Sequence, residues 1–276
     1  MYSDLFSNLH YLNKARKHLE QYLESLSKKQ NILPNQSWRL KNDNLRKQMS
    51  PQEIDSYINA INLQIECTKF ICSYKKETFN DDKPSTLFGN NDAKISLCCQ
   101  ILMAGNSVQE GFGFVIRIIQ CFNLSSTLVY TQISRELAKQ FNFKEINNLL
   151  KCIDESGYKE DKNVTFDECI STCIRVFAAI NNENCQNQTS NDTNAFNRHQ
   201  QVSKYSKEIE SLIQLIKSDE NKINAFILNG RLKSAYLIAI RLERVDIVKH
   251  IANVAERVGQ NLIRDICIKW LEKNAK

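Results

Sequence analysis

The chain has 276 residues, of which 42% are hydrophobic and 25% charged, and its formal net charge is +6. Nowhere does it contain the roughly 20 consecutive apolar residues that a membrane-spanning helix needs. The N-terminus carries Asp4 and lacks the apolar core of a secretory signal. We therefore expect a protein of the cytoplasm, large enough to bury a core of its own.

The first eighty residues predict two long helices. The first covers residues 4–26 and carries an apolar stripe of Leu5, Leu9, Leu12, Leu19, Tyr22, Leu23 and Leu26. In Ser50-Pro51-Gln52-Glu53, the serine can cap a second helix, the proline suits its first turn and the glutamate closes a capping box. This second helix should reach Tyr74 and bury Ile54, Ile58, Ile61, Ile65 and Phe70.

After a connector at 80–91, the sequence predicts a series of helices with no proline to break them. They are expected over 92–104, 107–122, 126–140, 143–156 and 165–180. Two pairs, Ser107 with Glu110 and Thr165 with Glu168, have the spacing of capping boxes.

Residues 181–201 are rich in Asn and Gln, and Phe196 is their only large apolar residue. We expect a disordered loop here, because so little apolar surface cannot offset the entropy lost on ordering. Short helices should follow over 202–217, 219–229, 231–242, 244–258 and 260–273. Four glycines fall at expected helix ends, where a left-handed cap favours glycine: Gly105, Gly157, Gly230 and Gly259.

Consecutive helices joined by turns of a few residues pack as antiparallel hairpins. The sequence therefore predicts an all-α fold, a helical-hairpin repeat array similar to an α-solenoid. We divide it into N-terminal long helices (1–80), helical repeats (81–180), the Asn/Gln-rich loop (181–201) and C-terminal helical repeats (202–276).

Neither a metal site nor another cofactor is predicted. The ten cysteines include no Cys-x-x-Cys pair, which a structural zinc site needs to present two thiolates from one turn. Cys169 and Cys173 share a helix face and are expected in the core. Gly111 and Gly113 lack the third glycine and the preceding strand of a nucleotide-binding motif, so we interpret them as points of close helix contact.

Catalytic residues are not assigned either. The histidines are scattered, and acidic neighbours such as Asp154 and Glu155 point in different directions on a helix. The chain is therefore interpreted as a binding protein that is not an enzyme.

A basic C-terminal stretch provides the candidate partner-binding residues. Residues 230–276 carry 10 basic and 5 acidic side chains. The candidates are Arg231, Lys233, Arg241, Arg244, Lys249 and Arg257. They would suit an acidic protein or an anionic membrane face, and an ordinary solvated helix surface is the alternative interpretation. The two large aromatics nearby, Tyr236 and Trp270, fall at core positions, so the pattern does not favour direct nucleic-acid binding.

Four strings resemble the C-terminal region of the spastizin family, large FYVE-domain proteins linked to hereditary spastic paraplegia. They are STLFGN (85–90), EGFGFVIRIIQCFNL (110–124), INNLLKCIDESG (146–157) and the stretch 219–271, which is the densest. The FYVE signature itself is absent, so binding of phosphatidylinositol 3-phosphate is expected only if a FYVE finger lies outside these residues.

The resemblance implies a scaffold that binds a spatacsin-like protein and the fifth adaptor-protein complex. It also implies recruitment to late endosomes and lysosomes, lysosome reformation after autophagy, and a link to cytokinesis at the centrosome or midbody. Membrane association would be indirect, through these partners. The alternative is a helical-repeat protein that binds RNA or serves another assembly.

Overall fold

The computed structural model describes residues 2–30, 50–74, 86–156, 162–186 and 204–274. Over these residues the chain forms twelve α-helices and no strand, which confirms the all-α repeat architecture. Contacts group the chain into two compact units, Met1–Leu124 (unit 1) and Ser125–Lys276 (unit 2). This boundary differs from those of the four segments expected from sequence. None of the described helices is long and apolar enough to traverse a lipid bilayer.

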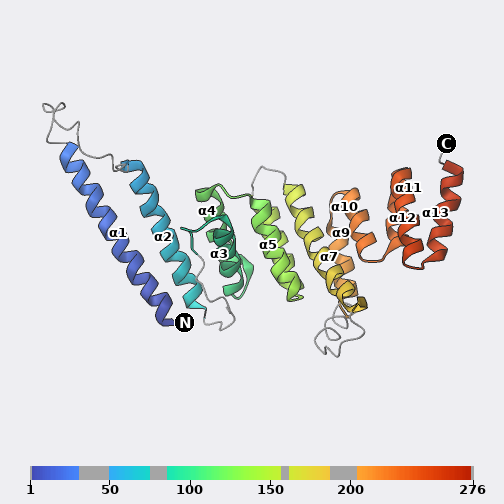
Figure 1. The fold of residues 1–276 in the computed structure, drawn as a ribbon, viewed down its shortest axis with the longest axis horizontal. Coiled ribbons are helices and arrows are strands. Elements are labelled where there is room, and N and C mark those ends of the chain that lie inside the picture. The colour runs from blue at the N-terminus through green and yellow to red at the C-terminus, as the bar shows by residue number, and fades with distance from the viewer. Residues whose placement is uncertain (1, 31–49, 75–85, 157–161, 187–203, 275–276) are drawn as a thin grey trace. The chain divides into compact units, whose positions relative to one another are not determined.

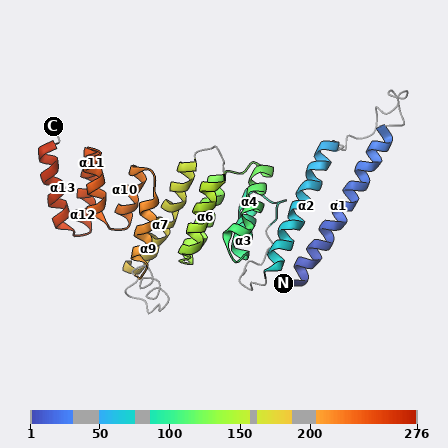
Figure 2. The ribbon, with the colours of Figure 1, turned by 180° about the vertical axis from the view of Figure 1, so that it is seen from behind.

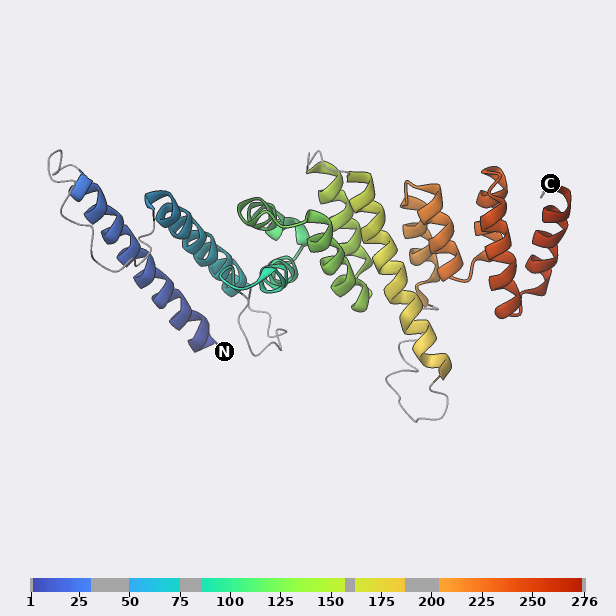
Figure 3. The same ribbon diagram turned by 45° about the horizontal axis from the view of Figure 1, so that its top comes forward.

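Unit 1 consists of two helical hairpins. Its helices are α1 (Tyr2–Gln30), α2 (Pro51–Ser73), α3 (Asn91–Ala104) and α4 (Val108–Phe122). The long helices α1 and α2 lie antiparallel, side by side, as the blue and cyan helices of Figures 1 and 3 show. On its other side, α2 contacts α3 and α4, which pack against each other.

The seam between α1 and α2 is built from residues spaced alternately three and four positions apart, as in a coiled coil. On α1 these residues are half-buried: Leu9, Leu12, Arg16, Leu19, Leu23 and Leu26. On α2 the opposing Ile54, Ile61 and Ile65 are fully buried. From Leu9 to Leu26 the predicted stripe is confirmed except for Tyr22, which is 40% exposed, and the side chain of Leu5 lies outside the described residues. Ile58 and Phe70, expected to be buried, are half-buried.

Helix α2 begins as the sequence predicts. The Ser50 hydroxyl accepts a hydrogen bond from the Glu53 amide at 3.2 Å, and the Glu53 carboxylate accepts one from the Ser50 amide at 2.7 Å. At the start of α4 the predicted box is replaced by a variant. There Ser107 accepts from the Gln109 amide, and Glu110 accepts from the amide of Asn106, which precedes the cap.

Unit 2 is a succession of shorter antiparallel helices (Figures 1 and 2). They are α5 (Ser126–Lys139), α6 (Phe143–Glu155), α7 (Lys162–Gln186), α9 (Ser206–Leu215), α10 (Asp219–Leu228), α11 (Leu232–Arg241), α12 (Val245–Arg257) and α13 (Asn261–Asn274). Helix α7 contacts α5, α6, α9 and α10, and from α10 to α13 each helix packs on the next. Sequential neighbours are therefore spatial neighbours, as in a repeat array.

Helix α7 differs from the prediction at both ends. It starts at Lys162, so Thr165 lies inside the helix and its hydroxyl contacts that of Thr127 on α5 at 2.8 Å. The capping box predicted at Thr165 is thus wrong. The helix also continues to Gln186, so residues 181–186 are helical and not part of a loop. The rest of the Asn/Gln-rich loop lies outside the described residues, as does Gly157.

The three turns that join the helices from α10 to α13 each contain one left-handed residue and are closed by the same hydrogen bond. In each, the amide after the left-handed residue donates to the carbonyl five positions earlier, the closure of a Schellman motif. The left-handed residues of these turns are Gly230 (φ 70°), Glu243 (φ 54°) and Gly259 (φ 74°). Phe141 (φ 53°), between α5 and α6, makes the same closure. Gly230 and Gly259 were predicted, whereas Gly105 is not left-handed, with φ −63°.

Candidate protein-interaction surface

All six predicted partner-binding residues lie on the surface of α10 to α12 or their turns. Arg231 and Arg244 are the residues that follow the left-handed turns before α11 and α12. Lys233 and Arg241 lie on α11, and α12 carries the other two, Lys249 and Arg257. Every one of the six is exposed.

Three of the six side chains bridge neighbouring helices. The Arg231 guanidinium lies 3.5 Å from the carboxylate of Glu210 on α9. The Arg241 guanidinium is hydrogen-bonded to both carboxylate oxygens of Asp219, in the first turn of α10, at 3.1 Å. Exposed ion pairs contribute about 0–1 kcal/mol each, so these arginines orient adjacent helices more than they stabilise them.

Arg244 holds the start of α12. It donates to both oxygens of Asp246, at 3.0 and 2.9 Å, and lies 3.8 Å from Glu220 on α10. These hydrogen bonds lower the pKa of Asp246 to about 2 and raise the pKa of Arg244. Arg231, Arg241 and Arg244 are therefore engaged within the chain.

Lys233, Lys249 and Arg257 differ, because no ion pair joins any of them to another described residue. On α11, Lys233 shares one helix face with Leu237, one turn away. The Leu237 side chain is 53% exposed. Lys249 and Arg257 are two turns apart on one face of α12. The structure thus separates the predicted basic set into three bridging arginines and three available cations.

A junction centred on Lys217 was missed by the sequence reasoning. The Asp167 carboxylate of α7 is only 2% exposed and accepts hydrogen bonds from the amides of Lys217 and Ser218, both at 2.8 Å. These amides lead into α10, so Asp167 caps that helix from another element. The Lys217 ammonium lies 3.2 Å from Asp154 on α6 and 4.7 Å from the ring centre of Phe166. In the sequence, Asp167 lies between Thr165 and Glu168, where a capping box was wrongly predicted. Nothing in the sequence indicates that it binds the amides of Lys217 and Ser218.

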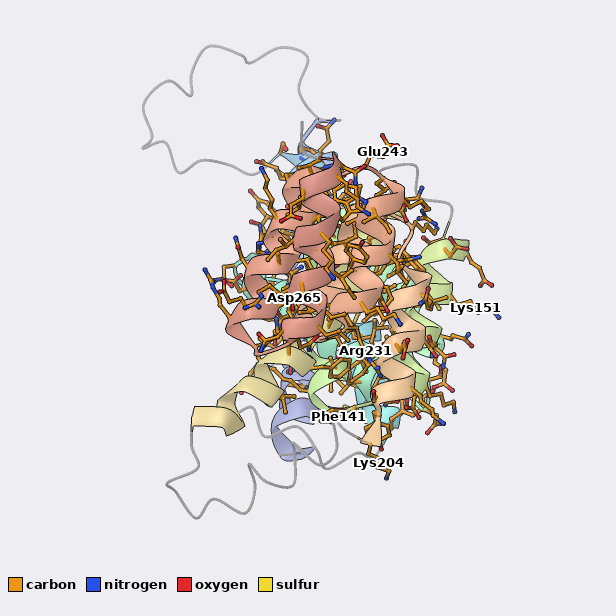
Figure 4. The ribbon with its side chains drawn as sticks, turned by 90° about the vertical axis from the view of Figure 1, so that its right-hand side faces the viewer. Phe141, Lys151, Lys204, Arg231, Glu243 and Asp265 are labelled. Carbon is orange, nitrogen blue, oxygen red and sulfur yellow. The ribbon has the colours of Figure 1, made fainter. Side chains whose placement is uncertain are left out.

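An aromatic cluster at one end of unit 2 was also missed. Phe177 of α7 stacks on Phe141 and Phe143, with ring centres 5.5 and 5.4 Å apart. Tyr205 lies 5.7 Å from Phe141 and 5.1 Å from Phe143. Figure 4 shows Phe141 and Lys204 together at this end, with Glu243 at the other. Because Phe177 is buried and the other rings are half-buried, the cluster packs the α5–α6 turn against α7 and α9.

Most cysteines that the structure describes are buried. Cys169 and Cys173 are fully buried as predicted, and burial raises the pKa of the Cys169 thiol to about 12. Thiols held protonated in this way are poor nucleophiles. His10, His18 and His250 are exposed. Over the part of the chain that the structure describes, no cluster of three or more His, Cys, Asp or Glu could hold a metal ion.

The amino-acid sequence is similar to those of known proteins. A family model described as "ZFYVE26-like, TPR repeats" matches residues 125–272, which is nearly all of unit 2 and more than half of the chain. Zinc finger FYVE domain-containing protein 26 from Rattus norvegicus and from Bos taurus is 31% identical over 276 residues, and the Homo sapiens protein is 30% identical. Each comparison covers 98% of this chain but 10% of the relative. No solved structure matches significantly.

These matches are consistent with the geometry. A TPR-repeat family and a stack of hairpins both point to a scaffold-type protein, whose helices bury one face on each other and expose another to partners. The chain corresponds to about a tenth of the relatives' length.

Proposed function

Because this chain belongs to the ZFYVE26-like family of TPR-repeat proteins, we propose that it is a non-enzymatic protein-binding scaffold of endolysosomal trafficking and autophagic lysosome reformation. Its partners would be a spatacsin-like protein and the fifth adaptor-protein complex. These would recruit it from the cytoplasm to late endosomes and lysosomes, and a role in cytokinesis at the centrosome or midbody would use the same surfaces. Through these residues, membrane association would be indirect, since they contain no Cys-x-x-Cys pair from which a FYVE finger could be built, and phosphatidylinositol 3-phosphate would be bound only by a FYVE finger outside them.

One observation supports this proposal more than any other. The repeat-family match ends where the stacked hairpins of unit 2 end, and those hairpins leave cations that have no partner among the described residues. Lys233 lies on the same helix face as the exposed Leu237, so that face presents a cation next to apolar surface. An acidic partner surface would complement Lys233, Lys249 and Arg257.

The experiment reverses only the available cations. A triple variant, Lys233→Glu with Lys249→Glu and Arg257→Glu, is compared with wild type in pull-downs against spatacsin and the fifth adaptor-protein complex. We expect wild type to retain a partner and the variant to lose at least about 10-fold in recovery, since like-charge contacts oppose binding. Arg241 and Arg244 are left intact because they bridge helices.

A matched control reverses exposed lysines elsewhere in unit 2, Lys144→Glu with Lys207→Glu, and should bind like wild type. If wild type recovers neither partner, the trafficking proposal is wrong. If RNA then co-purifies and its binding falls steeply with salt concentration, the RNA-binding alternative replaces it.

A further inference from the structure

Helix α13 exposes far more apolar surface than its neighbours. Seven of its residues are apolar (Leu262, Ile263, Ile266, Cys267, Ile268, Trp270 and Leu271), yet Cys267 is its only fully buried side chain. Within unit 2 the helix packs on α12 and α11. Leu262 is 75% exposed, more than any other large apolar side chain that the structure describes. The described part of the chain therefore leaves one face of α13 uncovered.

The uncovered face carries an ordered stripe. Leu262, Ile266, Lys269 and Lys273 are spaced four, three and four residues apart, so they lie on one side of the helix. We call these four residues the α13 stripe. Ile266 is 38% exposed, both lysines are exposed, and neither lysine has an ion pair with another described residue. The stripe is thus apolar in its first half and cationic in its second half.

In the turn before α13, Val258 is 58% exposed. Trp270 is half-buried and lies beside the stripe. Tryptophan is enriched at interface hot spots, and helices dock through apolar anchors spaced three or four residues apart. Figure 4 views unit 2 from the side of α13, with Asp265 of that helix labelled.

The charge order of the stripe argues against a second copy of the chain as its occupant. In an antiparallel pairing of two α13 helices, Leu262 and Ile266 would face Lys273 and Lys269 of the other copy. In a parallel pairing, the lysines would face each other. The first arrangement desolvates lysines without a counter-charge and the second adds like-charge repulsion.

A helix of opposite pattern fits both halves of the stripe. It would present apolar residues four positions apart to Leu262 and Ile266. One or two turns away it would present carboxylates to Lys269 and Lys273. We propose that the α13 stripe is the docking site for an acidic amphipathic helix of a partner protein. This inference rests on the proposed function only in making the chain a protein-binding scaffold, and it uses none of the cations tested above.

The test uses the full chain and two synthetic helical peptides of equal length. Both carry leucines four positions apart; one has glutamates and the other lysines at the charged positions. We expect fluorescence anisotropy to show micromolar binding of the glutamate peptide and at least 10-fold weaker binding of the lysine peptide. The double variant Lys269→Glu with Lys273→Glu should reverse that preference.

The apolar half is tested with Leu262→Gln, which should weaken the glutamate peptide about 10-fold. The matched control is Leu128→Gln on α5. Leu128 is also largely exposed, at 61%, and this variant should bind the glutamate peptide like wild type. Equal binding of both peptides, binding of neither, or no effect of Leu262→Gln would overturn the proposal. So would a dimer in sedimentation equilibrium that Leu262→Gln dissociates, because the stripe would then bind a second copy.

Loss of peptide binding and loss of the trafficking partners are separable outcomes. The charge reversals at Lys233, Lys249 and Arg257 leave the α13 stripe unchanged. Wild type could recover neither trafficking partner in the pull-downs and still bind the glutamate peptide more tightly than the lysine peptide. That result would refute the proposed trafficking function and leave the α13 docking site supported.

Discussion

The α1–α2 hairpin and the hairpins from α10 to α13 differ in the length of their helices and in the side chains that they bury. Helices α1 and α2 contain 29 and 23 residues, and they meet along a seam in which no described side chain of α1 is fully buried. The helices from α10 to α13 have 10 to 14 residues. Besides large residues such as Ile223 and Phe226, they bury five alanines: Ala225, Ala235, Ala239, Ala252 and Ala255.

The difference shows how helix length decides what holds a hairpin together. A long helix can spread partial burial over many turns, whereas a short isolated helix is marginal in water. Short helices must therefore approach closely, which alanines allow, and must be held by well-defined turns. We expect point substitutions in unit 2 to cost more than equivalent substitutions in the α1–α2 seam.

The largest contrast should come from truncating one apolar residue in each unit. Phe177→Ala removes a ring that is 1% exposed and stacked on two others, and should lower the free energy of unfolding of unit 2 by about 3–5 kcal/mol. Leu19→Ala in the half-buried seam should lower that of unit 1 by about 1–2 kcal/mol. Hydrogen exchange followed by peptide mass spectrometry assigns each loss to its unit. Equal losses would refute the contrast.

Removing the cap that joins α7 to α10 should have the next largest effect. Asp167→Ala leaves the Lys217 and Ser218 amides without their acceptor, and should cost unit 2 about 2–4 kcal/mol. Asp167→Asn keeps one acceptor oxygen and should cost less. Amide exchange at residues 217–221 should accelerate more than exchange in the middle of α5. If both variants unfold like wild type in urea, the junction is not a structural support.

A third prediction compares two glycines whose replacement by alanine should change stability in opposite directions. Gly259→Ala places a Cβ at φ 74° in the α12–α13 turn and should destabilise unit 2 by about 1–2 kcal/mol. Gly113→Ala lies mid-helix on α4 with no atom within 4 Å of the new Cβ, and should stabilise unit 1 by about 0.5–1 kcal/mol.

Gly111→Ala is the matched control for this glycine prediction. Its Cβ would lie 3.0 Å from the Ile101 carbonyl oxygen and 2.9 Å from the Ile101 Cγ2, so it should destabilise unit 1. Of the two glycines interpreted as close helix contacts, only Gly111 is one. Thermal unfolding of the three variants, with exchange data to assign each unit, would contradict this account if all shifts had the same sign.

Most helix boundaries followed from the sequence because each amphipathic stripe ends near a local signal. The α2 capping box and the left-handed Gly230 and Gly259 depend on residues within a few positions, so local chemistry suffices. The same reasoning failed at Thr165, where a capping-box spacing occurs within a helix that starts earlier. Glu243 and Phe141 could not be predicted as left-handed, because neither residue type favours that conformation and the backbone hydrogen bonds that close the two turns leave no signal in the sequence.

The basic composition of the candidate surface could be predicted from the sequence, but the ion pairs made by its individual side chains could not. The basic excess of residues 230–276 is visible in the sequence. Which cations are engaged depends on residues that the fold brings close, such as Asp219 for Arg241, 22 positions away. The exposure of Leu262 likewise depends on which helices cover α13, and its spacing alone does not distinguish an inner from an outer stripe.

The smallest effect concerns two exposed carboxylates that cap helices, one in each region. Hydrogen bonds from the Arg244 side chain lower the pKa of Asp246 from 3.8 to about 2, and the Ser50 amide lowers the pKa of Glu53 at the start of α2. Since both are depressed in the folded state, their contribution to stability is complete above the unfolded pKa values and is lost as pH falls through the folded ones. For Asp246 that window extends from about pH 4 down to about pH 2.

We expect a carbon-detected NMR titration to show Asp246 still ionised at pH 3, where ordinary carboxyls are largely protonated. Arg244→Gln should return the midpoint of Asp246 toward 3.8 without moving that of Glu53, because Arg244 contacts Asp246 and Glu220 and does not contribute to the pKa shift of Glu53. A wild-type Asp246 that titrates near 3.8 would show that the arginine does not hold this cap in solution. The short hairpins would then depend on their left-handed turns and buried side chains, with no help from the ion pair at the α11–α12 turn.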